Sequence, residues 1–144
     1  MERGEGKSGG EERRKKLPKR VVETEGGPPA VGPYSKAVRA GGWLYLSGQL
    51  PVDPESGELV SGPPAAAAER ALENLKAVLE GCGASLADVV KVTIYLARMA
   101  DFSEVNEVYS RYFPGEPPAR ACVGVAELPL GAPLEMELVA YVGG

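Results

Sequence analysis

The sequence predicts an α+β domain in which a mixed sheet of about six strands carries two helices on one face. Two segments have apolar residues at helical spacing, several short segments have strand patterns, and Gly and Pro residues separate them. Each helix has a single apolar face, which one face of a sheet can cover. With 144 residues, 44% of them apolar, the chain is long enough for one domain with a sizeable core.

A charged extension precedes this domain. The first 20 residues contain eight Lys/Arg and four Asp/Glu, so residues 21–144 keep eight of the 16 basic and sixteen of the 20 acidic residues, a net charge of −8. Residues 1–17 have no large apolar side chain between their two ends, so burial cannot offset the entropy lost on ordering. We expect a disordered tail over 1–17 and the folded domain over 18–144. The basic cluster Arg13–Lys16 could contact nucleic acid, but the composition favours a solubilising role.

The first half of the domain consists of short predicted strands joined by turns. Val21–Thr24 is expected as an edge strand. Ser35–Ala40 and Trp43–Gln49 flank Gly41-Gly42, the two-residue signal for a β-hairpin. Glu58–Val60 follows a turn rich in Pro, Asp and Gly and is expected as a further short strand.

Two amphipathic helices are expected next. The first begins at Pro63-Pro64, where a missing N–H costs nothing, and ends at Gly81. The second begins at Asp101 and ends before Pro114-Gly115. The apolar positions are Ala68, Ala71, Leu72, Leu75, Val78 and Leu79 in the first helix and Phe102, Val105, Val108, Tyr109, Tyr112 and Phe113 in the second.

Three further strands complete the predicted order ββ(β)αβαββ. Val90–Leu96 alternates apolar and polar residues, and Arg120–Ala126 and Leu134–Val142 are expected to form a final hairpin. The side expected to meet the helices carries Ala121, Val123, Val125, Leu134, Met136, Leu138, Ala140 and Val142. The opposite side carries Cys122, Gly124, Val139 and Tyr141, a small and semi-apolar surface that suits packing against another subunit.

The composition excludes several classes of site. The chain contains no histidine, so it has no Ser-His or Cys-His nucleophile pair and no histidine metal ligand. Cys82 and Cys122 lack CxxC spacing, which favours neither a zinc site nor a disulfide framework. We therefore expect a protein of a reducing compartment, the cytoplasm. No apolar run approaches the ~18 residues of a membrane span, and no apolar secretory segment precedes the domain.

Position alone leaves the candidate site residues undecided. Arg120 opens an apolar strand in an acidic domain, and a guanidinium at a strand end can bind a carboxylate with two parallel hydrogen bonds. This feature alone nevertheless favours pairing with a surface acid. Taken singly, Glu135 is a solvent-facing carboxylate, Tyr34 a half-buried anchor, and Cys122 a small core residue.

Six short motifs occur in order along the domain: Gly32–Ala37 (GPYSKA), Leu46–Gln49 (LSGQ), Glu73–Leu79 (ENLKAVL), Val90–Thr93 (VKVT), Phe102–Asn106 (FSEVN) and Pro118–Arg120 (PAR). Together they resemble the RidA (YjgF-type) reactive intermediate deaminase family, from about Lys19 to Val142. The resemblance implies a chorismate-mutase-like fold and a homotrimer with its sites between subunits. It also implies hydrolysis of enamine or imine intermediates of the 2-aminoacrylate type to 2-oxo acids and ammonia, without metal or organic cofactor.

The same resemblance assigns roles to particular residues. It implies that Arg120 binds the substrate carboxylate and that Glu135 is the second catalytic residue. The remaining matches, which would contact substrate, are Tyr34, Ser47, Gly48, Asn106 and Cys122. The chemistry requires one group that orients a water and moves a proton to the departing ammonia, and Glu135 is the candidate.

The expected hairpin of the last two strands makes a geometric prediction. Centred near Pro129-Leu130, it would place Arg120 opposite Ala140 and Glu135 opposite Val125. The two side chains would then lie about five residues apart along the strands, or roughly 16 Å. One small substrate cannot bridge that distance, so we expect a site shared between chains.

Two other functions stay open at this level. A non-enzymatic trimer that binds or senses 2-oxo acids would keep Arg120 without needing Glu135. A nucleic-acid partner is disfavoured, since Arg13–Lys16 is the only basic cluster and the rest of the chain is strongly acidic.

Overall fold

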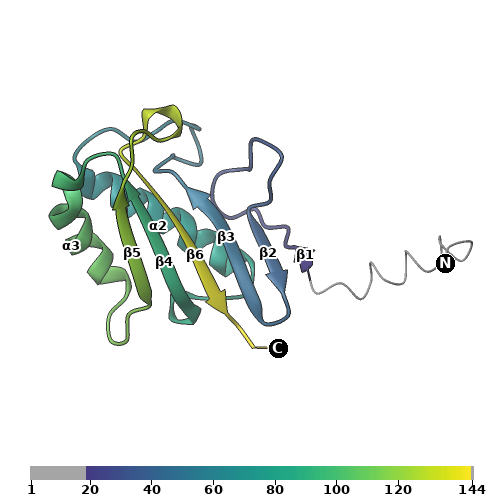
Figure 1. Cartoon of the computed structure of the whole chain (residues 1–144). Coiled ribbons are helices and arrows are strands. Elements are labelled where there is room, and N and C mark those ends of the chain that lie inside the picture. Colours follow the sequence, from purple (N-terminus) through teal and green to yellow (C-terminus); the bar gives the residue numbers. More distant parts are fainter. Residues whose placement is uncertain (1–18, 144) are drawn as a thin grey trace, which may run out of the picture.

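A six-stranded mixed sheet forms the centre of the molecule (Figure 1). The computed structural model describes residues 19–143, so the predicted disordered tail over 1–17 lies outside the described residues. The strands lie in the order β1-β2-β3-β6-β4-β5. Their bounds are β1 Lys19–Val21, β2 Ala37–Ala40, β3 Trp43–Gln49, β4 Val89–Leu96, β5 Ala119–Gly124 and β6 Leu134–Tyr141.

Two helices cover one face of this sheet (Figure 1). Helix α2 spans Pro64–Gly81 and helix α3 spans Phe102–Tyr112, and the two also pack against each other. A proline occupies the first turn of α2, as its missing N–H allows. The three 3₁₀ turns are η1 Leu86–Asp88, η2 Met99–Asp101 and η3 Pro129–Gly131. The predicted fold class, a mixed sheet with two helices on one face, is confirmed.

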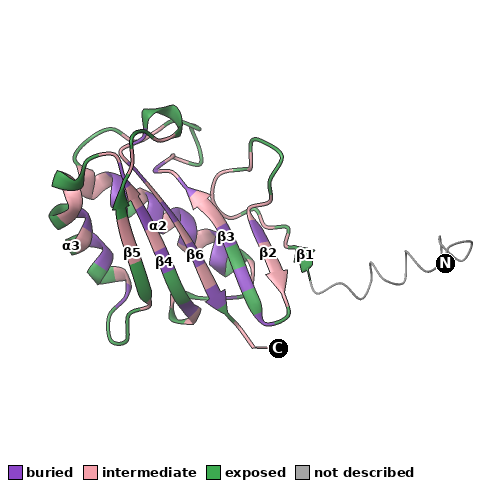
Figure 2. Cartoon of the chain, viewed as in Figure 1, coloured by how far each residue is buried: buried purple, intermediate pink, exposed green. Residues whose placement is uncertain are grey.

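The hydrophobic core lies between the sheet and the helices, where the buried residues gather (Figure 2). Leu72 and Leu75 of α2 belong to one buried cluster with Ile94 of β4 and Met136 of β6, and each of these side chains is at most 1% exposed. The apolar stripes of the helices therefore pack on the alternating apolar residues of the strands, as their periodicities predict.

The first strands agree with their predictions in place but not in every boundary. The hairpin of β2 and β3 around Gly41-Gly42 is confirmed. The edge strand begins earlier than expected and covers Lys19–Val21. The expected strand at Glu58–Val60 is reduced to a single bridge between Val52 and Leu59.

The predicted final hairpin is wrong. Strand β6 lies between β3 and β4, antiparallel to both, and β5 pairs in parallel with β4 at the edge. The β4–α3–β5 segment is a crossover unit, and its helix returns the chain parallel to β4. Strand β6 lies at the sheet centre because this position buries its alternate apolar side chains. Leu134, Met136, Leu138 and Ala140 are each at most 2% exposed there. An edge position would leave such a strand half uncovered.

The parallel register also corrects the faces of β5. Cys122 pairs with the buried Ile94 and therefore faces the helices, whereas the sequence placed it on the opposite side. Ala121 and Val123 face away from the helices, and Val123 is 43% exposed. The faces predicted for β6 are correct, with Leu138 covered by the helices and Val139 on the other side.

The face of the sheet that the helices do not cover carries large side chains. Trp43, Tyr45, Val123 and Tyr141 are each 43–48% exposed. Trp43 and Tyr141 contact each other edge to face across β3 and β6, with ring centroids 4.8 Å apart. We call this surface the open face. Among residues 19–143, no helix has the length and apolar composition needed to cross a membrane.

Candidate active site

Arg120 lies at the edge of the sheet, on the face that the helices cover. It pairs with Val92 of β4, so its side chain points to the side on which α3 packs. There the Nη1 group of Arg120 donates a hydrogen bond to Oδ1 of Asn106, at 2.6 Å. Arg120 is exposed, and this bond uses one of its five N–H donors. Helix α3 therefore fixes the direction of the guanidinium and leaves most of its donors free.

Two aromatic rings of α3 flank the same guanidinium. Its Cζ atom lies 5.5 Å from the ring centroid of Phe102 and 4.9 Å from that of Tyr109. Phe102, Asn106 and Tyr109 follow one another at four- and three-residue spacing, so they share one face of the helix. Within residues 19–143 the contacts of this guanidinium are an amide and two rings, not a carboxylate. Neutral groups thus hold the guanidinium in place without neutralising its charge, which remains available to an anion.

Cys122 follows Arg120 on the same face of β5. Burial raises the pKa of its thiol, and the positive charge of Arg120 offsets only part of that increase. Because an unperturbed thiol already titrates above neutrality, Cys122 is protonated at neutral pH. It forms a neutral wall beside Arg120 and is not an activated nucleophile.

A second cluster surrounds a cavity of about 690 Å³ at one end of β3 and β6. Four of the predicted site residues line it, namely Tyr34, Ser47, Gly48 and Glu135. Lys36 and Glu137 add charged groups to the wall. The apolar part of the wall consists of Pro28, Pro29, Val31, Leu50, Val52, Pro129 and Leu130.

A β-bulge shapes this cavity. Leu46 pairs with Leu138 and Gln49 with Met136, so Ser47 and Gly48 together oppose the single Glu137. The hydroxyl of Ser47 donates to the carbonyl oxygen of Ser35 at 2.5 Å, which ties the bulge to the preceding segment. Bulges bend a strand and redirect its groups, and here the bulge brings the backbone of Gly48 against Glu135.

The contact between Gly48 and Glu135 requires glycine. A Cβ atom at position 48 would lie 2.7 Å from Oε2 of Glu135 and 2.9 Å from its Cδ. Such distances are below van der Waals contact, so a larger residue would displace the carboxyl group. The absence of a side chain at position 48 therefore defines where the Glu135 carboxyl lies.

Gly48→Ala is expected to lower the kcat of the imine hydrolysis that the family resemblance implies by about 10- to 100-fold. A displacement of the Glu135 carboxyl by the order of 1 Å suffices for a loss of that size. The melting temperature should change little, since the atom that must move is the end of a flexible side chain. Steady-state kinetics and thermal unfolding measure the two effects. An unchanged kcat in Gly48→Ala would show that the space at position 48 does not control the position of the Glu135 carboxyl.

Glu135 is also electrostatically distinct. Partial burial raises the pKa of its carboxyl, and the nearby Glu137 raises the pKa further. A carboxyl with a raised pKa accepts a proton more readily than an ordinary glutamate, as proton transfer near neutral pH requires.

The segment after β3 is held by a buried polar residue. Asn74 of α2 is fully buried, and its Nδ2 group donates to the carbonyl oxygens of Leu50 and Val52 at 3.2 and 2.9 Å. The Nε group of Arg70 donates to its Oδ1 at 3.2 Å. This residue therefore supports one wall of the cavity without lining it.

The two clusters do not meet within one chain. Arg120 aligns across β4 with Leu138, so Glu135 lies two strands and three residues away. At ~4.8 Å per strand and ~3.3 Å per residue, the backbone separation is about 14 Å. The side chains also point to opposite faces, because Val92 beside Arg120 is buried under the helices and Tyr95 beside Glu135 lies on the open face. A separation thus follows from the observed register, although the predicted hairpin of β5 and β6 does not form.

Several residues of these clusters were not identified from the sequence. Phe102 and Tyr109 were assigned to the helical core stripe, which gives no indication that their faces flank Arg120. Glu137 alternates with Glu135, and that spacing is the signal that could have placed it in the cavity wall. Leu130, 73% exposed at the cavity rim with φ of 60°, has no sequence signal. Residues 19–143 include no cluster of three or more acidic or cysteine side chains arranged to hold a metal ion.

Comparison with known proteins identifies the family of this chain. A family model described as Endoribonuclease L-PSP, the YjgF/RidA family, matches residues 24–142. The chain belongs to this family. The motif resemblance to RidA proteins is thereby confirmed.

Individual relatives of the RidA family cover almost the whole domain. A RutC family protein of Pyrococcus abyssi is 49% identical over 87% of this chain and 98% of its own. The human protein named 2-iminobutanoate/2-iminopropanoate deaminase is 46% identical over 88% of this chain and 93% of its own. The crystal structure of a Thermotoga maritima protein described as a candidate endoribonuclease is 54% identical. It superposes with a TM-score of 0.83 over 87% of this chain and 98% of that one.

Proposed function

We propose that this protein hydrolyses enamine and imine intermediates of the 2-aminoacrylate type to 2-oxo acids and ammonia. The observation that carries the proposal is the guanidinium of Arg120, which Asn106 and two rings hold in place without a carboxylate partner among the described residues. A guanidinium group held in this way can bind the carboxylate of a small substrate with two parallel hydrogen bonds. The deaminase name of the human relative supports the same reaction.

We further propose that the working form is a homotrimer with its sites between subunits. The Arg120 cluster and the Glu135 cluster lie on opposite faces of one sheet, so they can face each other only across two chains. The open face, with Trp43, Tyr45, Val123 and Tyr141, supplies apolar surface of the kind that subunits bury. In this assembly Asn106, Arg120 and Cys122 come from one chain, and Tyr34, Ser47, Gly48 and Glu135 come from its neighbour.

The proposed chemistry needs only these side chains, backbone groups and water. The enamine tautomerises to the imine, and Arg120 holds its carboxylate. Glu135 takes a proton from a water as the water oxygen bonds to C2 of the protonated imine and the C=N π electrons move to nitrogen, which forms a tetrahedral amino alcohol. The carboxyl then returns this proton to the amino nitrogen. The C–N bond breaks with its electron pair on nitrogen while the hydroxyl group loses its proton to water and becomes the carbonyl, so ammonia and the 2-oxo acid leave. Gly48 leaves room for the carboxyl to approach, and Cys122 limits the pocket beside the substrate.

The pH dependence follows from the role of Glu135 as the base. Protonation removes the base, so kcat/KM is expected to fall as the pH drops through the raised pKa of Glu135, at a higher pH than for an ordinary glutamate. Glu137→Gln removes one cause of the increase and should move this acid limb to lower pH. The control Glu116→Gln changes an exposed carboxylate outside the cavity wall and should leave the limb in place. An acid limb that Glu137→Gln does not move would contradict the assignment of Glu135.

A second function shares the same binding group. A trimer that binds or senses 2-oxo acids would need Arg120 but not the pKa of Glu135 or the close approach at Gly48. The cavity around Glu135 therefore favours catalysis over binding alone. The two functions separate in Glu135→Gln, which should keep affinity for a 2-oxo acid and lose hydrolysis.

A coupled assay tests the proposal directly. A serine or threonine dehydratase generates the enamine in the presence of this protein, and the appearance of the 2-oxo acid is followed against the uncatalysed rate. We expect the rate to increase in proportion to protein concentration. Arg120→Ala is the matched control and should give no increase. A rate independent of the protein would overturn the proposed function.

A further inference from the structure

Two arginines lie side by side at the opposite edge of the sheet from Arg120. Arg20 of β1 and Arg39 of β2 are direct partners in the antiparallel register, so their side chains extend from the same face. Partner Cα atoms are about 5 Å apart, and like charges in this position repel. Two of the few basic residues of this acidic domain therefore lie where their positive charges repel each other.

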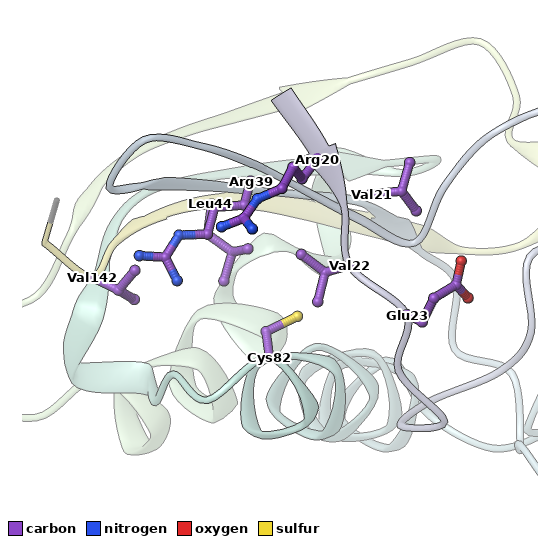
Figure 3. A pocket seen from close by; sticks show the side chains of 8 residues that line it. All are labelled: Arg20, Val21, Val22, Glu23, Arg39, Leu44, Cys82 and Val142. Carbon is purple, nitrogen blue, oxygen red and sulfur yellow. The ribbon is translucent and has the colours of Figure 1, made fainter. Parts of the chain in front are cut away.

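No acidic group among residues 19–143 neutralises this pair. Arg39 donates to the carbonyl oxygens of Gly41 and Gly143, at 2.8 and 3.2 Å. Glu23 is the one acid that lines the pocket beside them, and its carboxylate points to the end away from both guanidinium groups (Figure 3). Arg39 contacts neutral groups, and neither guanidinium has an acidic partner among the described residues, so the pair forms a site of concentrated positive charge.

The C-terminus of α2 does not account for the arginines. It lies at the floor of the pocket, where Cys82 caps the helix. Its last carbonyl groups accept hydrogen bonds from the backbone N–H groups of Cys82, Gly83 and Ala84, at 2.9–3.1 Å. The helix end is thus satisfied by its own chain, and the guanidinium groups are not needed as its cap.

The arginines border a cavity of about 310 Å³ with an apolar floor. Both guanidinium groups project to the side where Leu44 and Val142 lie, and the Cys82 thiol points into the pocket toward Val22 (Figure 3). Leu44 is only 1% exposed, so this floor belongs to the core itself and is rigid. The pocket has two guanidinium groups at its rim and an apolar floor, and its volume suits a small organic molecule.

We propose that this pocket binds a small organic phosphate, with its dianionic head between Arg20 and Arg39 and a short apolar body on Val22, Leu44 and Val142. Guanidinium groups match phosphate oxygens in bidentate geometry, and two of them match a doubly charged head. The site is separate from the Arg120 and Glu135 clusters and does not depend on the proposed deaminase function.

Isothermal titration of the full-length protein with butyl phosphate, inorganic phosphate and pentanoate tests the chemistry. Butyl phosphate should bind at least about tenfold more tightly than inorganic phosphate, which has no body for the apolar floor, and than pentanoate, which carries one charge. The absence of measurable butyl phosphate binding would overturn the proposal. So would equal affinity for inorganic phosphate, or tighter binding of pentanoate that Arg20→Gln weakens, since carboxylate binding at Arg120 would not respond to that substitution.

Substitutions locate the contacts. Arg20→Gln, on an exposed edge strand, should weaken butyl phosphate binding about tenfold or more, the loss expected for a charge-assisted hydrogen bond. Arg39→Gln should do the same, with thermal unfolding as the check that the fold persists. Arg111→Gln removes one exposed positive charge outside the pocket and should change the affinity less than about twofold. An equal loss in Arg111→Gln would show general charge attraction and overturn the site.

The two free cysteines distinguish this pocket from the Arg120 cluster. Bound butyl phosphate should slow the alkylation of Cys82 by iodoacetamide, because that thiol lies in the pocket. Cys122, beside Arg120, should react at its original rate, and mass spectrometry of the two peptides separates them. Protection of Cys122 in place of Cys82 would put the anion in the Arg120 cluster and overturn the proposal.

Discussion

Arg120→Lys is expected to lower kcat/KM for the imine about 100-fold. Lysine keeps the positive charge, but its ammonium cannot present two parallel N–H groups to a carboxylate. It also loses the planar contact with Phe102 and Tyr109 that holds the side chain in one direction. Because orientation as well as charge is lost, we expect both a raised KM and a lowered kcat.

The same variant should keep its fold. Arg120 is exposed at an edge strand, so its replacement leaves no buried cavity, and the melting temperature should stay within a few degrees of wild type. Arg111→Lys, an exposed arginine outside the Arg120 cluster, is the matched control and should keep full activity. Activity is measured in the dehydratase-coupled assay. Wild-type kcat/KM in Arg120→Lys would remove Arg120 from the site.

Local periodicity predicted the elements of this fold but not the order of all its strands. The stripe containing Leu72 and Leu75 predicts α2 because helical spacing is a property of the segment alone. Whether β6 pairs with β5 or enters between β3 and β4 depends on burial of the whole sheet. The strong alternation of Leu134, Met136 and Leu138 is compatible with both positions. The face of Cys122 was predicted wrongly because Ala121 and Val123 form the more apolar of the two sets of alternate residues in β5, whereas the pairing with Ile94 turns Cys122 toward the helices.

The site could be predicted by resemblance, but not its geometry. The PAR motif places Arg120, whereas its partners Phe102 and Tyr109 look like ordinary core residues in the sequence. Similarly, the SGQ motif places Gly48, but the bulge that brings it against Glu135 arises from a register shift between strands far apart in the chain. Contacts of this kind depend on pairing over long sequence separations, which periodicity does not report.

A mixture of Arg120→Ala and Glu135→Ala subunits is expected to regain activity that neither variant has alone. In the proposed trimer each cleft takes Arg120 from one chain and Glu135 from its neighbour. A cleft is intact when a Glu135→Ala chain supplies the arginine and an Arg120→Ala chain supplies the glutamate. Random assembly of equal amounts makes about one quarter of the clefts intact, so activity should approach about a quarter of wild type.

A second mixture makes the result decisive. Wild-type chains exchanged with the Arg120→Ala/Glu135→Ala double variant also leave about one quarter of the clefts intact if each cleft needs two wild-type chains. If both residues of a cleft came from one chain, this mixture would keep about one half of the activity and the mixture of single variants would stay inactive. Mass spectrometry of the intact oligomers verifies that the subunits have exchanged. Zero recovery after verified exchange would contradict the shared site. Arg120 and Glu135 lie on opposite faces of one sheet, and this result would mean that assembly does not bring Arg120 of one chain and Glu135 of its neighbour into one cleft.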